Sequence, residues 1–261
     1  MRAAPRVRLR GRTLSDNVVG PARRSVELLE ARPLNRRLPI TRTFNVNRRD
    51  FSASLIGTGF GAVALSWTAA GRAQAATPVE GAQFTRVEPP VAPTVPGKIE
   101  VLEFFSYACP HCNSFEPAIE AWAKKLPADV AFRRVPVPFL YNFENFTRLY
   151  YALETMGQVG AMQAKVFAAV HVEHLRLDKP ADIAALMAKN GLDGTKFLDV
   201  FNSFSVATSA ARAKKLAAAY KIDGVPTVTV QGRYATSPGQ AGGHEQALAV
   251  VDYLIQRVRK G

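Results

Sequence analysis

The chain has 261 residues and a formal net charge of +13, a value typical of nucleic-acid-binding proteins. Residues 1–75 hold 14 arginines, no lysine and 4 acidic residues, so most of that charge lies there. Residues 76–261 hold 20 basic and 17 acidic residues, and this near balance excludes a basic nucleic-acid-binding domain. The chain has only two cysteines and four histidines, which excludes a disulfide-rich scaffold and a four-cysteine zinc site.

Residues 1–46 form an arginine-rich extension with four prolines and no sustained apolar period. Such a composition cannot bury enough apolar surface to fold, so we predict a disordered or non-native segment. Our hypothesis is a misplaced start, with Val46 as a GTG codon that is read as methionine. A mitochondrial-type targeting arm is the alternative.

Residues 47–75 have the layout of an export signal peptide. Paired arginines, Arg48-Arg49, precede a mildly apolar stretch over 55–70, and a small-residue cleavage site ends at Ala75. The arginine pair resembles the twin-arginine export signal, and an ordinary Sec signal is the alternative. We expect cleavage near Ala75, after the small-residue site. Because glycines interrupt the apolar stretch, we expect no stable membrane insertion. The mature protein is then expected in the periplasm, where disulfides form.

The exported part begins with a leader and a strand–helix–strand unit. Residues 76–96 are rich in proline and predict a leader with at most one short edge strand. The apolar run over 99–106 predicts a buried central strand. The period then changes to that of a helix that begins at Pro110, a residue suited to the first helical position. The next strand is predicted over 130–137.

The second half of the chain is mostly helical. Only helical signals occur from Asn145 to about Phe204, which predicts an inserted all-helical domain over 139–204, between 97–138 and 205–261. The order of elements therefore predicts an α/β fold that the helical domain interrupts. Three elements follow the insertion: a helix over 206–220, a β-hairpin that begins at Val228, and a closing helix over 245–258.

The two cysteines lie in the motif Cys109-Pro110-His111-Cys112, directly after the predicted buried strand. A structural disulfide that closes so short a loop would stabilise the fold little, and a zinc site would lack ligands. Redox chemistry is therefore our interpretation. Free N–H groups at the helix start, the helix dipole and His111 should lower the pKa of Cys109. We expect Cys109 to be the exposed nucleophile and Cys112 to be a more buried resolving thiol.

Three further titratable side chains stand out. Glu103 is an acid within an apolar strand, and two interpretations stay open: a carboxylate with a structural partner, or a proton acceptor for Cys112. His171 and His174 are three residues apart, and we interpret them as a solvated helix end. No further ligands lie near them in the sequence, so we expect no metal site.

The sequence Glu-Phe-Phe-Ser followed by Cys-Pro-His-Cys resembles the DsbA family of exported thiol oxidants, in order and length over residues 84–261. The resemblance implies a thioredoxin-like fold with an inserted all-helical domain. It also implies a cis peptide bond between Val225 and Pro226. In that arrangement the Val225 backbone would pair with an extended substrate, Pro226 would shield the sulfurs, and Thr227 would complete the substrate-binding segment. Without the resemblance, Pro226 indicates only the start of an edge strand.

The resemblance also implies a reaction and partners. Reduced exported proteins would be the substrates, and an inner-membrane, quinone-linked partner would reoxidise the cysteine pair. We expect a monomer with no cofactor. The expected catalytic set is Cys109, Cys112, His111, Pro110 and Glu103. The alternatives are a disulfide isomerase or reductase of the same fold, or an exported chaperone-like module with a redox clamp.

The chain departs from the best-known family pattern on its second strand. Some members carry a lysine there that helps to move the buried proton. This chain has Arg133-Arg134 in the matching region, and an arginine keeps its proton. Glu103 or water would then have to move the buried proton.

Overall fold

The computed structural model describes residues 77–261, so the expectations for 1–46 and 47–75 lie outside the described residues. Within that part, five strands form one sheet in the order β1-β5-β4-β2-β3. β2 and β3 are parallel, and the other neighbouring strands are antiparallel. The strands are β1 (Thr85–Arg86), β2 (Ile99–Phe105), β3 (Val130–Pro136), β4 (Thr227–Val230) and β5 (Tyr234–Thr236).

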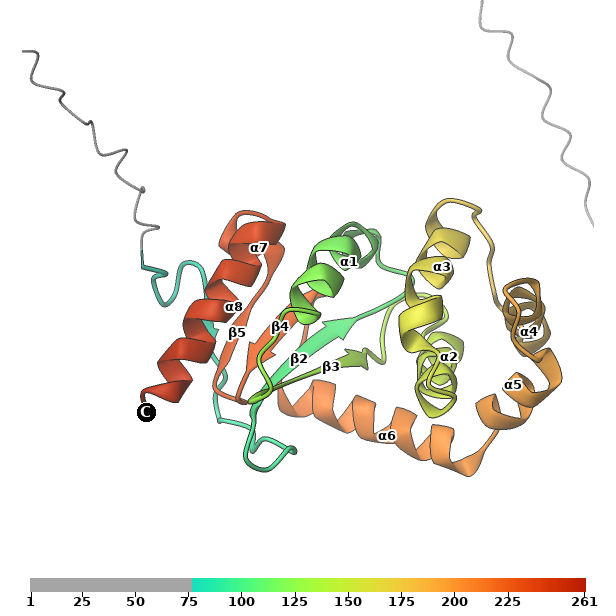
Figure 1. Cartoon of the computed structure of the whole chain (residues 1–261), viewed down its shortest axis with the longest axis horizontal. Helices are drawn as coiled ribbons and strands as arrows, with labels where there is room; N and C mark the ends of the chain where they lie inside the picture. The colour runs from blue at the N-terminus through green and yellow to red at the C-terminus, as the bar shows by residue number, and fades with distance from the viewer. Residues whose placement is uncertain (1–76) are drawn as a thin grey trace, which may run out of the picture. The chain divides into compact units, whose positions relative to one another are not determined.

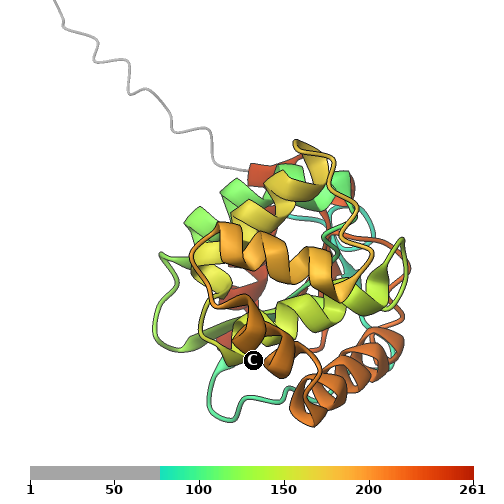
Figure 2. The same ribbon diagram turned by 90° about the vertical axis from the view of Figure 1, so that its right-hand side faces the viewer.

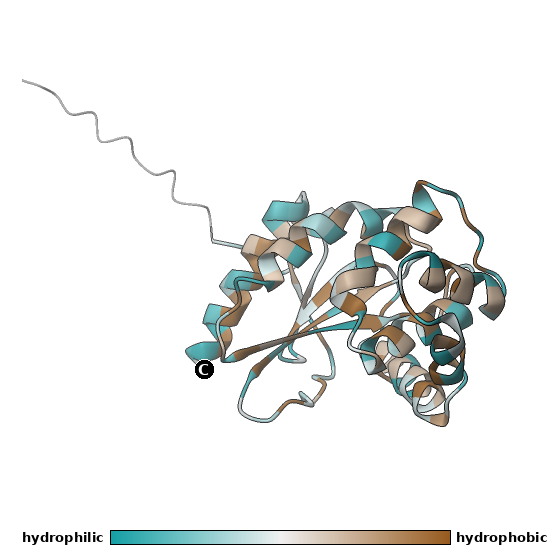
Figure 3. Cartoon of the chain, turned by 45° about the vertical axis from the view of Figure 1, so that its right-hand side comes forward, coloured by the Kyte–Doolittle hydropathy of each residue, from teal (hydrophilic) through white to brown (hydrophobic). Residues whose placement is uncertain are grey.

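Helices cover both faces of this sheet (Figure 1). α1 (Pro110–Ala123) and α8 (His244–Arg259) lie on one face, and α6 (Phe204–Ala219) lies on the other. Alternate residues of β2 face the two layers, because successive side chains of a strand point to opposite sides. Val101 thus packs with the α1 and α8 layer, whereas Leu102 and Phe104 pack against α6. Figure 3 shows apolar (brown) residues alternating with polar (teal) ones along the helices that cover the sheet.

The helices of the insertion lie beyond the ends of β2 and β3 (Figures 1 and 2). Their buried side chains form one continuous core with Tyr107 and both cysteines. The insertion therefore packs directly against the cysteine motif. The helices lie within the segment that carried only helical signals: α2 (Phe143–Thr155), α3 (Val159–His171), α4 (Pro180–Lys189) and α5 (Gly194–Phe201).

One short helix was not predicted. α7 (Pro238–Ala241) lies in a stretch that reads as a loop from its glycines and proline. Its first turn is stabilised by Ser237, whose Oγ accepts a hydrogen bond from the Gln240 amide at 3.1 Å. No helix of residues 77–261 is both long and apolar enough to cross a lipid bilayer.

The proline-rich leader is part of the sheet structure. β1 pairs with β5 at the sheet edge, which confirms the predicted short edge strand. Further on, the Val91 amide donates to the Gly232 carbonyl at 2.9 Å. The backbone approaches so closely that a Cβ on Gly232 would lie 1.7 Å from the Val91 oxygen, and Gly232 has a φ of +62°. Only glycine fits this crossing.

A Gly232→Ala substitution should therefore destabilise the protein strongly. The positive φ and the contact with Val91 should together cost about 2–5 kcal/mol in urea unfolding. Gly97→Ala is the matched control, because Gly97 has a φ of +72° but open space around its Cβ position. We expect the control to cost only about 1–2 kcal/mol. Equal losses for the two variants would show that the crossing is not tight.

Candidate active site

The cysteine motif is held where a strand passes into a helix. α1 begins at Pro110, as predicted, and Cys109 is its N-cap residue in an extended conformation. The Cys109 amide donates to the Ser106 carbonyl at 3.1 Å, which closes a turn after β2. The Cys109 carbonyl accepts from the Asn113 amide at 3.1 Å, so the helix starts at once. This geometry leaves the first amides of α1 near the Cys109 sulfur.

The segment before β4 lies directly opposite Cys109. The Val225–Pro226 peptide bond is cis, which confirms the expectation from the resemblance. The Cys109 thiol donates to the Val225 carbonyl at 3.4 Å. Cys109 is only 6% exposed and Cys112 is fully buried. The order of burial is as predicted, but the expectation of an exposed nucleophile was wrong, because this segment and the insertion cover the thiol.

The two thiols, which are free in the structure, have opposite acid–base properties. A hydrogen bond from the Cys112 thiol lowers the pKa of Cys109 from 9.0 to about 6, against the effect of burial. The backbone N–H groups of Cys112 and His111 and the charge of His111 act in the same direction. Burial instead raises the pKa of Cys112 far above the range of ordinary thiols. At neutral pH, Cys109 is therefore the thiolate and Cys112 the thiol.

A buried charge cluster lies behind the motif, centred on Arg134, which is 8% exposed. Its guanidinium donates to Glu103 at 2.9 Å and to Glu116 and Glu120 at 3.0 Å each. The parallel register of β2 and β3 sets Glu103 directly opposite Arg134. α1 contributes Glu116 and Glu120 from successive turns, so the helix that carries the cysteines also carries two of the acids.

The carboxylates of this cluster are not equivalent. Burial raises the pKa of Glu103, although the Arg134 charge opposes it. Burial also raises the pKa of Glu116 to about 8, so this group can gain and lose a proton near neutrality. Glu103 adds to the raised pKa of Cys112, which shows that the cluster and the buried thiol interact. Both interpretations of Glu103 thus retain support: it has a structural partner, and it is electrostatically coupled to Cys112.

Sequence reasoning did not single out Glu116 or assign Arg134 a partner. A signal for Glu116 was available, because it lies four residues after Cys112 and so on the same buried face of the helix. The interpretation of His171 as a solvated helix end was wrong. His171 is half-buried, and its Nε2 lies 2.8 Å from the Tyr107 carbonyl oxygen. Over residues 77–261, no three side chains of the ligating types are grouped to hold a metal ion.

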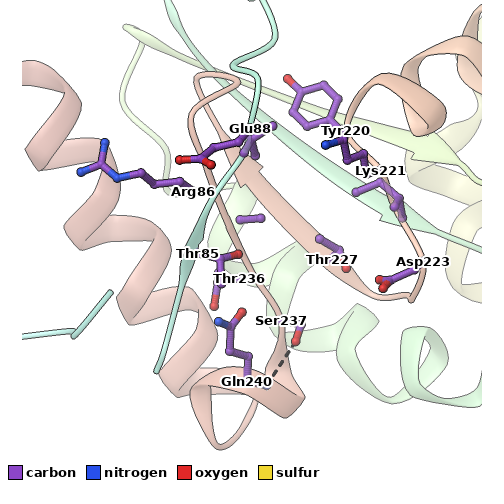
Figure 4. A pocket seen from close by; sticks show the side chains of 13 residues that line it. Thr85, Arg86, Glu88, Tyr220, Lys221, Asp223, Thr227, Thr236, Ser237 and Gln240 are labelled. Carbon is purple, nitrogen blue, oxygen red and sulfur yellow. Dashed lines mark hydrogen bonds between the residues drawn. The ribbon is translucent and has the colours of Figure 1, made fainter. Parts of the chain in front are cut away.

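Two adjoining pockets lie beside the cis-proline segment, and one of them reaches the cysteine motif. The first has a volume of about 340 Å³ and is lined by His111, Val225 and Pro226 among others. The second, of about 350 Å³, lies between β1, β5 and the end of α6 (Figure 4). Both pockets share Asp223, Thr227 and Ser237, so they meet beside the cis-proline segment. Together they offer space for an extended polypeptide rather than for a folded domain.

A reactive dithiol at a helix N-terminus, opposite a cis-proline that directly precedes a neighbouring strand, defines the class of thioredoxin-fold thiol:disulfide oxidoreductases. A family model described as a DSBA-like thioredoxin domain matches residues 100–247, and the chain belongs to this family. It has a thioredoxin-like fold with an inserted helical region, and it is a protein disulfide oxidoreductase.

Several proteins of known identity are similar to the chain over most of their length. The thiol:disulfide interchange protein DsbA of Pseudomonas aeruginosa is 43% identical over 187 residues, which span 72% of this chain and 89% of that protein. DsbA of Bordetella parapertussis is 46% identical over 71% of this chain and 89% of its own length. The crystal structure of Pseudomonas aeruginosa DsbA gives a TM-score of 0.68 at 43% identity, covering 70% of this chain and 95% of that one. DsbA from Xylella fastidiosa gives 0.66 at 30% identity, covering 71% and 100%.

Proposed function

We propose that the chain is a dithiol oxidase that donates its Cys109–Cys112 disulfide to reduced proteins. The observation that carries this proposal is the opposite pKa change of the two thiols, with Cys109 lowered to about 6 and Cys112 raised. A stabilised Cys109 thiolate favours the reduced dithiol form over the disulfide. The disulfide is therefore a strong acceptor of electrons. A reductase of this fold would need a less stabilised thiolate.

The reaction takes place in two thiolate displacements. A substrate thiolate attacks the Cys109 sulfur of the disulfide, forms a mixed disulfide, and releases Cys112 as the leaving group. A second thiolate of the same substrate then attacks its own sulfur in that mixed disulfide and releases Cys109 as a thiolate. The substrate loses two electrons as its disulfide forms, and the enzyme gains them as two reduced cysteines. The low pKa of Cys109 makes it a good leaving group in the second step.

The buried acid cluster supports proton transfer to and from Cys112. The raised pKa of this residue means that the thiolate released in the first step takes up a proton at neutral pH. Arg134 keeps its own proton and cannot supply one. Glu103 is coupled to Cys112, and Glu116 shares Arg134 with it and titrates near pH 8. We assign Glu103 as the exchanging acid nearest the thiol and Glu116 as its relay.

The substrate-binding segment would be Val225, Pro226 and Thr227. The Val225 carbonyl oxygen lies 3.4 Å from the Cys109 sulfur, so an extended substrate that reaches Cys109 would run beside the Val225 backbone and could pair with it. Pro226 is buried beneath it, and Thr227 begins β4 where the two pockets meet. His111 and Pro110 are exposed beside the first pocket, where they can contact the substrate.

The cellular setting follows from the signal-like segment and from the family. We propose export to the periplasm with cleavage near Ala75, exported reduced proteins as substrates, and an inner-membrane, quinone-linked partner that reoxidises the pair. The protein would act as a monomer. We further propose that 97–138 and 205–261 form the thioredoxin-like domain and that 139–204 is its helical insertion.

Thiol alkylation in cells tests the direction of electron transfer, since a cysteine pair found mostly reduced would contradict an oxidase.

Titration of Cys109 is the direct test of the proposal. Absorbance of the thiolate near 240 nm in the reduced protein should rise with a midpoint at about pH 6. The folded pKa lies below the ordinary 9.0, so the thiolate stabilises the reduced fold above pH 9, and this stability is lost as the pH falls through 6. Unfolding of the reduced protein against a Cys109→Ser variant should show that pH dependence. A midpoint near 9 would overturn the oxidase mechanism.

A further inference from the structure

Three side chains on one face of helix α3 contact the hydroxyl, the ring and the backbone carbonyl of Tyr107. Gln163, Phe167 and His171 are spaced four residues apart, which places them in a row. The Tyr107 hydroxyl donates to the Gln163 amide oxygen at 2.6 Å, and the Phe167 ring lies edge-on at 5.1 Å from the Tyr107 ring. His171 lies 2.8 Å from the Tyr107 carbonyl oxygen. Phe167 also stacks on the His171 imidazole at 6.1 Å, and this contact fixes the ring.

Tyr107 occupies the second position of the turn that presents the reactive thiol. The Cys109 amide closes this turn on the Ser106 carbonyl, and the Ala108 amide donates to the Ser106 hydroxyl at 3.1 Å. The peptide plane between Tyr107 and Ala108 is the one that differs between the two common turn types. Ser106 holds the N–H end of that plane, and His171 holds the carbonyl end. A carbonyl oxygen only accepts, so the His171 Nε2 carries the hydrogen.

We propose that His171 is a positioning residue that fixes the Tyr107–Ala108 peptide plane and thereby the turn that carries Cys109. A peptide unit has a dipole of about 3.5 D, so a flip of this plane would reorient a dipole close to the charged sulfur. With the plane held, the donors around Cys109 stay preorganised for the thiolate. The insertion would in this way tune the reactivity of a thiol that belongs to the other part of the fold.

The same row links the insertion to the acid cluster. The Gln163 amide nitrogen donates to Glu116 at 3.4 Å, while its oxygen accepts from Tyr107. One residue of α3 therefore contacts both the turn before Cys109 and the acid that titrates near pH 8. This second contact supports a role of α3 in positioning the site, beyond the packing of its apolar residues.

The test compares three variants of the full chain. His171→Leu removes the donor, His171→Gln keeps an N–H group at similar reach, and Lys165→Leu changes an exposed position of the same helix. The measurements are the Cys109 thiolate titration and the equilibrium of the pair with glutathione. We expect His171→Leu to shift that equilibrium toward the oxidised protein by about threefold to tenfold, which is half to one pKa unit. His171→Gln and Lys165→Leu should match the wild type.

The outcomes separate this inference from the proposed function on which it rests. If the wild-type Cys109 titrates at an ordinary value, the oxidase proposal fails. If the wild type titrates near 6 and His171→Leu does the same, the positioning role alone is overturned. A merely structural role would lower the melting temperature in His171→Leu without moving the titration. Should the leucine variant not fold, His171→Asn, whose shorter amide does not reach the carbonyl, replaces it with the same expected shift.

Discussion

A Cys112→Ala variant will accumulate covalent adducts with substrate proteins through Cys109. The variant cannot form its own disulfide, so its Cys109 thiolate enters a mixed disulfide by attacking an existing disulfide of an exported protein and releasing one of that protein's thiolates. Cys112 is then absent and cannot attack Cys109 to free the captured protein. Cys109 remains reactive because its thiolate also receives N–H donors from the first turn of α1 and the charge of His111. The variant loses the hydrogen bond of the Cys112 thiol, so we expect its Cys109 pKa to lie above that of the wild type. Expression in the exported compartment followed by non-reducing electrophoresis should show high-mass bands that vanish on reduction.

The matched control is the double variant Cys109→Ser/Cys112→Ala, which should form no adducts. Cys109→Ser alone should reduce the oxidation of a reduced, unfolded substrate to the uncatalysed level, because Cys112 has no partner left with which to form the disulfide that the substrate attacks. If Cys112→Ala formed no adducts although it was folded and exported, the catalytic cycle proposed for Cys109 would be wrong.

Replacement of Arg134 by methionine should produce a large loss of stability. Arg134 is the common partner of Glu103, Glu116 and Glu120, and the first two are buried. Removal of the cation leaves buried carboxylates unpaired, which costs about 3–5 kcal/mol. The loss should grow with pH. A carboxyl whose pKa is raised in the fold, such as Glu116 at about 8, favours folding below its unfolded pKa and loses this contribution as the pH rises through 8.

Urea unfolding at pH 5 and pH 8 measures this effect. At pH 5 the buried carboxyls of the variant hold their protons, so the loss should be smaller than at pH 8. Arg259→Met is the control, because Arg259 pairs with Asp129 at the surface, where an ion pair contributes about 1 kcal/mol or less. An Arg134→Met variant as stable as Arg259→Met at pH 8 would contradict the unpaired-carboxylate account.

The strands and helices that position the site could be predicted from local patterns. The apolar run of β2 is long enough for a buried strand, and Pro110 marks the start of α1 because a missing N–H is tolerated there. The sequence also contained the cysteine pair and the order of burial of its two thiols. These features depend on neighbours within one or two turns of chain.

The remaining features of the site depend on contacts between distant segments. Glu103 meets Arg134 only because β2 and β3 pair in one particular register, and His171 meets Tyr107 only because α3 docks beside the turn. Cys109 is covered by Val225, which lies 116 residues away along the chain. The pattern of apolar and polar residues along the sequence does not indicate such long-range contacts. For that reason the solvated His171 and the exposed Cys109 were wrong expectations, while Cys109 as the more acidic thiol was correct.

The long separation between Cys109 and Val225 has a consequence for biosynthesis. A nascent chain that ends after the helical insertion already contains both cysteines but lacks the strand that faces them. At that point Val225 and Pro226 are not yet present to cover the Cys109 sulfur. The complete redox centre forms only when β4 pairs with β2 between the earlier strands of the sheet, so its maturation waits for the C-terminal part of the chain.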